Sequence, residues 1–152
     1  MAGIKANLVN IVESLILNKG VDTFLFGSKS KFNSLCYNTV SELKKKYPYI
    51  KRIYVRSFDA DADEEYISFL LSRYEETFQP ENIFGKASYV QRNREMINMS
   101  KYCVAYYDKN YLPPRRKNGK KALHDYQPES GTTVAYAYAL KKGKEIINIF
   151  EA

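Results

Sequence analysis

The feature that most constrains the fold is an alternation of short apolar runs with longer segments of helical periodicity. The run DTFLFG (22–27) ends in glycine, and KRIYVRSF (51–58), KYCVAYYD (101–108) and KEIINIF (144–150) have a similar character. Short apolar runs of this length are typical of buried strands in a parallel sheet. We therefore predict a strand at each of these four places.

The segments between the strands carry apolar residues at helical spacing. They predict helices over about 4–18, 35–47, 63–78 and 88–100, and a last helix that begins near 130. Gly20 follows the first helix, where a left-handed residue is wanted. Strands alternating with helices favour an α/β fold, a three-layer sandwich around a mostly parallel sheet of four to five strands. No repeat or linker divides the sequence, so we predict one domain over 1–152.

The composition favours a soluble, cytoplasmic protein. No stretch approaches the roughly 18 apolar residues of a membrane span, and the start of the chain lacks the pattern of a signal peptide. The two cysteines, Cys36 and Cys103, have no metal-binding spacing, so we expect both to be small buried hydrophobic residues and expect no metal site.

The positive charge of the chain is concentrated in one segment. Five basic residues lie within 115–121, and without them the net charge falls from +7 to +2. This basicity belongs to one loop and does not require a nucleic-acid partner.

The first candidate site follows the first predicted strand, in the sequence FGSKSKFN. Gly27 ends the strand, and Ser28, Ser30 and Asn33 lead into the next helix together with two lysines. Helix starts at the carboxyl ends of parallel strands favour anions, because their free N–H groups and positive dipole ends point outward. The structural alternative is a polar turn in which Ser30 or Asn33 caps the helix.

The second candidate site is the turn that opens the last helix. Ser130, Gly131, Thr132 and Thr133 combine three hydroxyl groups with one glycine. Gly131 would let a ligand approach the backbone, and Ser130 or Thr132 could cap the helix. Capping alone explains the hydroxyls almost as well as a phosphate or ribose site does.

The third candidate is QRNRE (91–95), at the start of a polar helix. Arg92 and Arg94 could neutralise a phosphate, and Asn93 could bond a ribose or a base edge. The alternative is a solvated helix face on which Glu95 pairs with one of the arginines.

Two other sequence features give little indication of a functional site. The acids of DADADEE (59–65) lack the glycine and glutamate of a calcium-binding loop, so we predict a solvated turn and favourable charges in the first turn of a helix. His124 has no identified nucleophile near it in sequence, and we expect no catalytic role for it.

Taken together, the segments at 20–48, 89–108 and 130–149 resemble the SLOG superfamily, in particular its YpsA-like stand-alone bacterial branch, which is related to DprA and the Lonely-guy phosphoribohydrolases. The resemblance runs from about residue 7 to 150 and implies a Rossmann-like fold with a pocket for nucleotides or nucleotide-derived ligands. Residue by residue, it aligns Gly27 and Ser28 with the family's Gly-x-Ala loop, Phe32 and Asn33 with its Phe-Asp, Arg92 and Asn93 with its Arg-Asn pair, and Ser130, Gly131 and Thr132 with its Ser/Gly-Gly-Thr turn.

The sequence departs from that family at three points. It starts at the first helix, so we expect the family's N-terminal strand and its loop to be missing. Asn33 replaces the usual aspartate. The glutamate of the phosphoribohydrolase signature has no counterpart, because Val134, Ala135 or Tyr136 occupies its place. This last departure weighs against catalysis.

These observations lead to one main hypothesis and two alternatives. The main hypothesis is a ligand-binding protein that holds the phosphate of a nucleotide or nucleotide-derived signal at the helix starts 27–33 and 130–133, assisted by Arg92, without a cofactor. The first alternative is an N-glycosidase or transferase with Glu129, Asp108 or Glu95 as the acid. The second is a nucleic-acid binder that uses 115–121 with Tyr106, Tyr107 and Tyr111. A homo-oligomer is compatible with each of them.

Overall fold

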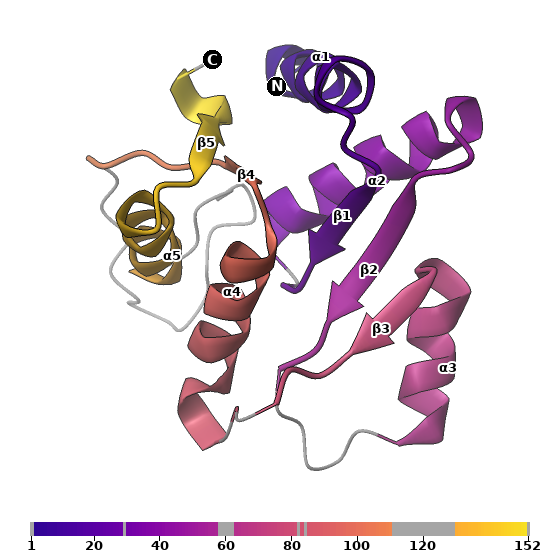
Figure 1. The fold of residues 1–152 in the computed structure, drawn as a ribbon, viewed down its shortest axis with the longest axis vertical. Coiled ribbons are helices and arrows are strands. Elements are labelled where there is room, and N and C mark those ends of the chain that lie inside the picture. The colour runs from indigo at the N-terminus through magenta and orange to yellow at the C-terminus, as the bar shows by residue number, and fades with distance from the viewer. Residues whose placement is uncertain are drawn as a thin grey trace.

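The computed structural model describes residues 2–28, 30–57, 63–81, 83, 85–110 and 130–151. Helices and strands alternate along the chain, and every paired strand in the described part is parallel to its neighbour (Figure 1). The fold is therefore α/β and Rossmann-like, as the sequence pattern and the resemblance predict.

The elements follow one another in a regular order. The helices are α1 (Ala2–Lys19), α2 (Lys31–Lys46), α3 (Glu64–Arg73), α4 (Ser88–Met99) and α5 (Ser130–Lys141). The strands are β1 (Thr23–Phe26), β2 (Lys51–Val55), β3 (Glu76–Phe78), β4 (Tyr102–Ala105) and β5 (Glu145–Asn148). Short 3-10 turns, η1 (Gly85–Ala87) and η2 (Ile149–Glu151), precede α4 and follow β5. The four strands predicted from apolar runs and the predicted helices are thus confirmed, apart from the end of the third helix.

The strands form two small sheets instead of one. β1, β2 and β3 pair in that order, with Leu25 opposite Ile53 and Ile53 opposite Glu76, while β4 pairs with β5. In Figure 1 the arrows of β1–β3 point to the lower left and those of β4 and β5 point upward, and α4 stands between the first sheet and α5. The expected continuous sheet of four to five strands is therefore divided into three and two.

The predicted helix over 63–78 is wrong at its end. α3 stops at Arg73, and the N–H of Tyr74 closes it by donating to the carbonyl of Leu70 at 2.8 Å. The next residues form β3, which pairs with β2, and the hydroxyl of Thr77 donates to the carbonyl of Tyr54 at 2.9 Å. Tyr74 and Phe78 continued the helical spacing by chance. Pairing with β2 instead supplies backbone hydrogen bonds to Thr77 and Phe78, a β-branched and an aromatic residue that favour strands.

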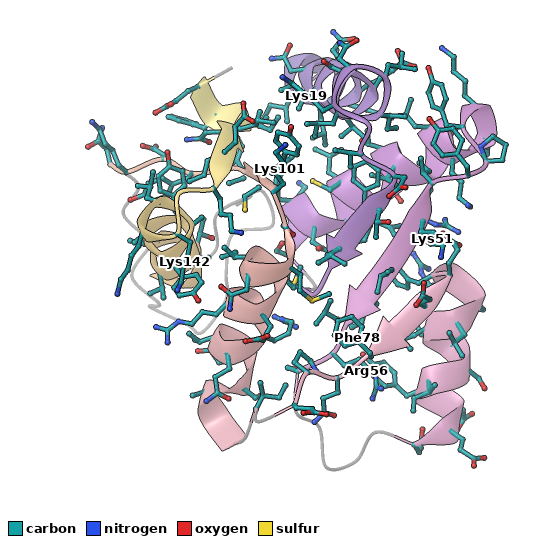
Figure 2. All side chains as sticks on the ribbon, viewed as in Figure 1. Lys19, Lys51, Arg56, Phe78, Lys101 and Lys142 are labelled. Atoms are coloured by element: carbon teal, nitrogen blue, oxygen red, sulfur yellow. The ribbon has the colours of Figure 1, made fainter. Side chains whose placement is uncertain are left out.

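The β2–β3 pairing extends beyond the ladder. The N–H of Arg56 donates to the carbonyl of Phe78 at 2.7 Å, and Figure 2 shows these two residues side by side below the strands. The carboxyl ends of β2 and β3 are therefore held together at the edge where ligands sit in α/β sheets.

The predicted helix boundaries have clear local causes. Asp63 caps α3 by accepting from the N–H of Tyr66 at 2.9 Å, and Glu64 and Glu65 lie in its first turn, as the acidic segment predicted. Gly20 ends α1 and Gly143 follows α5, each with φ of 68°. Only glycine adopts this left-handed conformation without strain from a Cβ.

A single apolar cluster connects the two sheets. α1 contributes Leu8, Val12 and Ile16, and the cluster reaches from Phe26 of β1 to Ile149, which follows β5. Val104 of β4 packs against the same cluster. Because no backbone ladder joins the two sheets in the described part, apolar packing under α1 holds them together.

Among the described helices, none combines the length and the apolar character that a bilayer span requires. Cys36 and Cys103 are free thiols and are both half-buried. Burial raises the pKa of the Cys36 thiol to about 12, in agreement with the small apolar role predicted for it.

Replacing Leu8 with alanine tests the role of the cluster. Leu8 is fully buried, so Leu8→Ala should lower the free energy of unfolding by about 2–5 kcal/mol. Leu17 lies on the same helix and is 59% exposed, so Leu17→Ala should cost about 0.5 kcal/mol or less. Urea denaturation of both variants measures the difference, and equal losses would contradict the assigned core.

Candidate functional site

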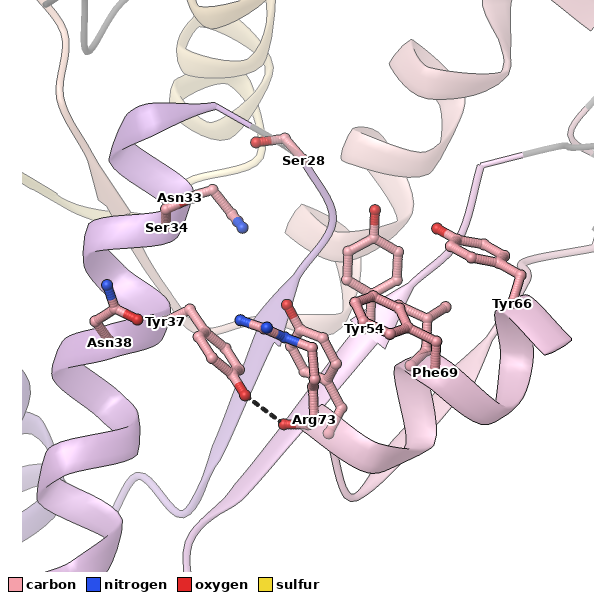
Figure 3. Close-up of a pocket in the computed structure, with 11 residues that line it drawn as sticks. Ser28, Asn33, Ser34, Tyr37, Asn38, Tyr54, Tyr66, Phe69 and Arg73 are labelled. Carbon is pink, nitrogen blue, oxygen red and sulfur yellow. Dashed lines mark hydrogen bonds between the residues drawn. The ribbon is translucent and has the colours of Figure 1, made fainter.

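A pocket of ≈ 290 Å³ opens between α2 and α3, beside the carboxyl ends of β1 and β2 (Figure 3). Its walls come from the β1–α2 junction, from β2 and from α3 and the residue after it. The lining residues are Ser28, Asn33, Ser34, Tyr37, Asn38, Tyr54, Tyr66, Phe69, Leu70, Arg73 and Tyr74. Two predicted site residues, Ser28 and Asn33, therefore lie in a real cavity.

Hydroxyl groups organise the start of α2 at one end of this pocket. The Oγ of Ser30 accepts from the N–H of Asn33 at 3.1 Å, so Ser30 caps the helix, which is one of the two caps that the structural alternative allowed. The Oγ of Ser28 lies 3.0 Å from the Oγ of Ser30 and accepts from its N–H at 3.3 Å. Capping uses one of the four N–H groups that a helix start leaves without a partner inside the helix.

Aromatic rings form the other side of the pocket. Tyr74 contacts Tyr37 at a centroid distance of 4.9 Å and Tyr54 at 5.2 Å. Tyr54 and Tyr74 are each only 7% exposed, and burial raises the pKa of Tyr54 to about 12. Their phenol groups therefore stay protonated at neutral pH and offer rigid faces with hydroxyl tips.

Arg73 closes the aromatic side. The hydroxyl of Tyr37 donates to the backbone carbonyl of Arg73 at 2.6 Å (Figure 3). The guanidinium of Arg73 lies over the ring of Tyr37 at 4.9 Å and near that of Phe69 at 5.8 Å. Stacking on two rings orients this cation at the pocket.

A partly exposed ion pair supports the wall from behind. Arg52 of β2 donates from Nη2 to Oε2 of Glu75 at 2.7 Å and from Nε to Oε1 at 3.1 Å. Its backbone N–H donates to Oε1 of Glu75 at 2.8 Å, and its guanidinium lies 5.5 Å from the Tyr37 ring centroid. This two-point contact fixes Arg52 beneath Tyr37.

The charge state of Glu75 depends on this contact. Burial alone would raise the pKa of Glu75, but the hydrogen bonds from Arg52, assisted by the charge of Lys44, more than offset it and the pKa is lowered. The Nζ of Lys44 lies 3.7 Å from Oε1 of Glu75. The carboxylate is therefore stabilised in its ionised form.

The structure also brings Gly27 and Arg92 together. A Cβ at Gly27 would lie 2.7 Å from Cδ of Arg92 and 2.6 Å from Sδ of Met96. Gly27 is buried, and its φ is not left-handed, so the missing side chain serves the close approach of α4. The glycine thus allows a neighbouring helix to pack against the end of β1.

Arg92 is a buried cation, only 6% exposed. Its Nε donates to Oδ1 of Asn93 at 3.0 Å, and no described carboxylate forms an ion pair with it. Burial lowers the pKa of Arg92, whereas electrostatic interactions with Tyr54 and Tyr66 oppose the shift. Asn93 thus orients Arg92, and neither of these two residues is among the described residues that line the pocket.

The neighbouring residues Arg94 and Glu95 face a different cavity. This second cavity, of ≈ 680 Å³, lies beside α4 and α5 and includes Asn98 and Tyr138 in its lining. The Arg94 guanidinium lies 5.4 Å from the Tyr138 ring centroid, and no described arginine pairs with Glu95. Across the described ranges no cluster of three acidic, histidine or cysteine residues has a metal-binding arrangement.

The start of α5 stands apart from the pocket. α5 begins at Ser130, so Thr132 and Thr133 lie in its first turn. Thr132 is half-buried and Thr133 is exposed, and neither lines the pocket beside α2. The side chain of Ser130 and the surroundings of Gly131 lie outside what the structure describes.

The features of the nucleic-acid alternative are only partly described. The basic residues 115–121, Tyr111, His124 and Glu129 lie outside the described residues. Tyr106 contacts Phe150 at a centroid distance of 5.6 Å, and Tyr107 lies 4.3 Å from Tyr136, so both half-buried rings pack against another aromatic ring. Figure 2 shows Lys19, Lys51, Lys101 and Lys142 spread over separate parts of the molecule. These labelled lysines do not form one basic surface.

Sequence reasoning missed most of the pocket lining. Tyr66, Phe69 and Arg73 recur at three- and four-residue intervals on α3, a spacing that places them on one helix face. That spacing and the 14 tyrosines of the chain were the available signal. Neither segment alone predicts that α2 and α3 line the same pocket beside the strand ends.

No protein-family model matches this sequence, and a search of curated proteins finds no significant match. The functional argument therefore rests on the geometry of the site.

A methyl group at Gly27 should disturb the contact between β1 and α4. Gly27→Ala should lower the free energy of unfolding by about 1–3 kcal/mol, because Arg92 and Met96 must move. Gly3→Ala is the matched control: it lies in α1 with open space around it and should stabilise by up to about 1 kcal/mol. Thermal unfolding compares the two, and an equally tolerated Gly27→Ala would contradict the close approach.

The Arg52–Glu75 contact predicts a pH dependence of stability. Because the folded pKa of Glu75 is lowered, its stabilisation is present above the ordinary glutamate pKa and is lost as the pH falls through the lowered value. The stability difference between wild type and Glu75→Gln should therefore shrink between about pH 7 and about pH 2. Glu76→Gln is the control, since its contact with Lys51 is exposed and 3.5 Å long. A pH-independent difference for Glu75→Gln in urea denaturation would argue against this assignment.

Proposed function

We propose that this protein binds a nucleotide or a nucleotide-derived ligand in the pocket between α2 and α3. The observation that supports the proposal is that the two ends of this cavity carry different chemical groups. One end is a helix start with hydroxyl and amide groups, and the other is a wall of aromatic rings. A nucleotide has the matching parts, an anionic phosphate and a flat ring.

The phosphate belongs at the start of α2. This helix has 16 residues, and its positive dipole end and free N–H groups favour an anion near Ser28 and Asn33. Arg92 packs against Gly27, one residue before Ser28, and adds a buried positive charge there. In a partly buried site such a charge acts through a lower dielectric than in water and attracts an anion more strongly.

The ring of the ligand belongs on the aromatic side. Tyr37, Tyr66 and Phe69 present faces and edges to the cavity, and stacking a base on an aromatic side chain contributes about 1–3 kcal/mol. The cavity of ≈ 290 Å³ is at the small end of ligand pockets, which span about 300–1,000 Å³. This size suits one base with its sugar.

The lining chemistry favours binding over hydrolysis. No carboxylate is among the described residues that line this pocket. Of the acids considered for an N-glycosidase, Glu95 faces the second cavity and Asp108 accepts from the N–H of Asn110 at 2.9 Å. A general acid at the scissile bond therefore has no candidate in the described lining.

Membership of the SLOG superfamily is part of the same proposal. The Rossmann-like order of elements and the proximity of the Gly27 loop to the Arg92–Asn93 pair support it. A non-catalytic, nucleotide-sensing member of that superfamily is the function that we infer.

Isothermal titration with adenine and guanine nucleotides and cyclic ADP-ribose isomers tests the proposal. At least one of them should bind, and Phe69→Ala should weaken that binding by about 5- to 150-fold through loss of stacking. Leu71→Ala is the matched control, because Leu71 is exposed on α3 like Phe69 but does not line the pocket. Absence of binding by the folded protein, or equal effects of the two variants, would refute a nucleotide site here.

A further inference from the structure

The guanidinium of Arg73 is a cation without a polar partner in the described structure. It donates no hydrogen bond to a described residue and forms no ion pair with a described carboxylate. It lies over the rings of Tyr37 and Phe69, at 4.9 and 5.8 Å. The donor groups of Arg73 are therefore held at the pocket by stacking and remain available to a ligand.

Arg73 lies at the end of the pocket opposite the start of α2. Figure 3 shows Ser28 at one end and the Arg73 side chain at the other, beside Tyr37. A ligand whose phosphate lies near Ser28 would place its base against the aromatic rings, with the outer edge of the base toward Arg73. In this orientation of the ligand, Arg73 would contact the edge of the base.

The geometry of a guanidinium selects among base edges. Two parallel N–H donors match two adjacent acceptors, and the 6-oxopurines guanine and hypoxanthine offer O6 and N7 in this arrangement. Adenine offers N7 beside an amino group, which is itself a donor and opposes the guanidinium. No carboxylate among the described lining residues would accept from the adenine amino group, and the carboxamides of Asn33 and Asn38 lie on the α2 side of the pocket.

We infer that the pocket is selective for a 6-oxopurine, whose O6 and N7 accept from Arg73 while the ring stacks beside Tyr37 and Phe69. The inference rests on the proposed function and assigns its ligand to guanine or hypoxanthine nucleotides. The Arg52–Glu75 pair contributes indirectly, since Arg52 contacts Tyr37 from behind and so helps to fix the ring on which Arg73 stacks. A guanidinium that is already held in place before binding loses less conformational entropy when the ligand binds.

Titration of GMP, IMP and AMP, together with guanosine and adenosine, tests this selectivity. GMP and IMP should bind about 5- to 150-fold more tightly than AMP. Arg73→Gln should reduce this ratio to about 1 or reverse it, because a carboxamide pairs well with adenine. The ratio of GMP to guanosine affinity, which measures the phosphate contribution, should not change in Arg73→Gln.

Arg94→Gln is the matched control. Arg94 also stacks on a tyrosine ring, but it does so at the second cavity, so its replacement should leave the base preference intact. Circular dichroism should show that both variants are folded, since both arginines are exposed.

Three results would overturn the inference. If AMP binds as tightly as GMP, the selectivity is absent although the nucleotide site remains. If Arg73→Gln lowers the GMP-to-guanosine ratio instead of the guanine-to-adenine ratio, Arg73 holds the phosphate and the orientation is reversed. If no nucleotide binds at all, the proposed function fails, and the selectivity fails with it.

Discussion

Apolar packing beneath α1 is the interaction on which the rest of the structure depends. In the described part no backbone hydrogen bonds join the β1–β2–β3 sheet to the β4–β5 pair, so the two are held by side chains. Leu8, Val12 and Ile16 form one cluster with Phe26 and with Ile149 after β5. Burial of such side chains contributes about 1.5–3 kcal/mol each, which is comparable to the whole stability of a small domain when a few are combined.

Two further contacts turn this framework into a pocket. The absence of a side chain at Gly27 lets α4 approach β1, and this brings the buried charge of Arg92 against the residue that follows the strand. On the other side, the Arg52–Glu75 pair connects β2 to the end of α3 and supports Tyr37. The pocket is therefore shaped by packing and by one ion pair.

Local sequence patterns predict some elements of the fold and miss others. Apolar runs and helical spacing predicted β1, β2, β4 and β5 and the positions of the helices, because burial imposes a period that a local pattern records. β3 was missed because Tyr74 and Phe78 continue the helical spacing of α3, and only pairing with β2 made that segment extended. The division into two sheets is a property of contacts between distant segments and has no local pattern.

The candidate site was likewise predicted only in part from the sequence. The sequence by itself determined the cap at Ser30, the cation at Arg92 and the alternation of strands and helices, because capping, charge and periodicity are local properties of the chain. Only the tertiary structure decided that Gly27 accommodates Arg92, that Arg94 faces another cavity, and that α2 and α3 enclose an aromatic pocket. The physical reason is that a cavity is defined by side chains that meet across the fold, and their meeting depends on how every element packs at once.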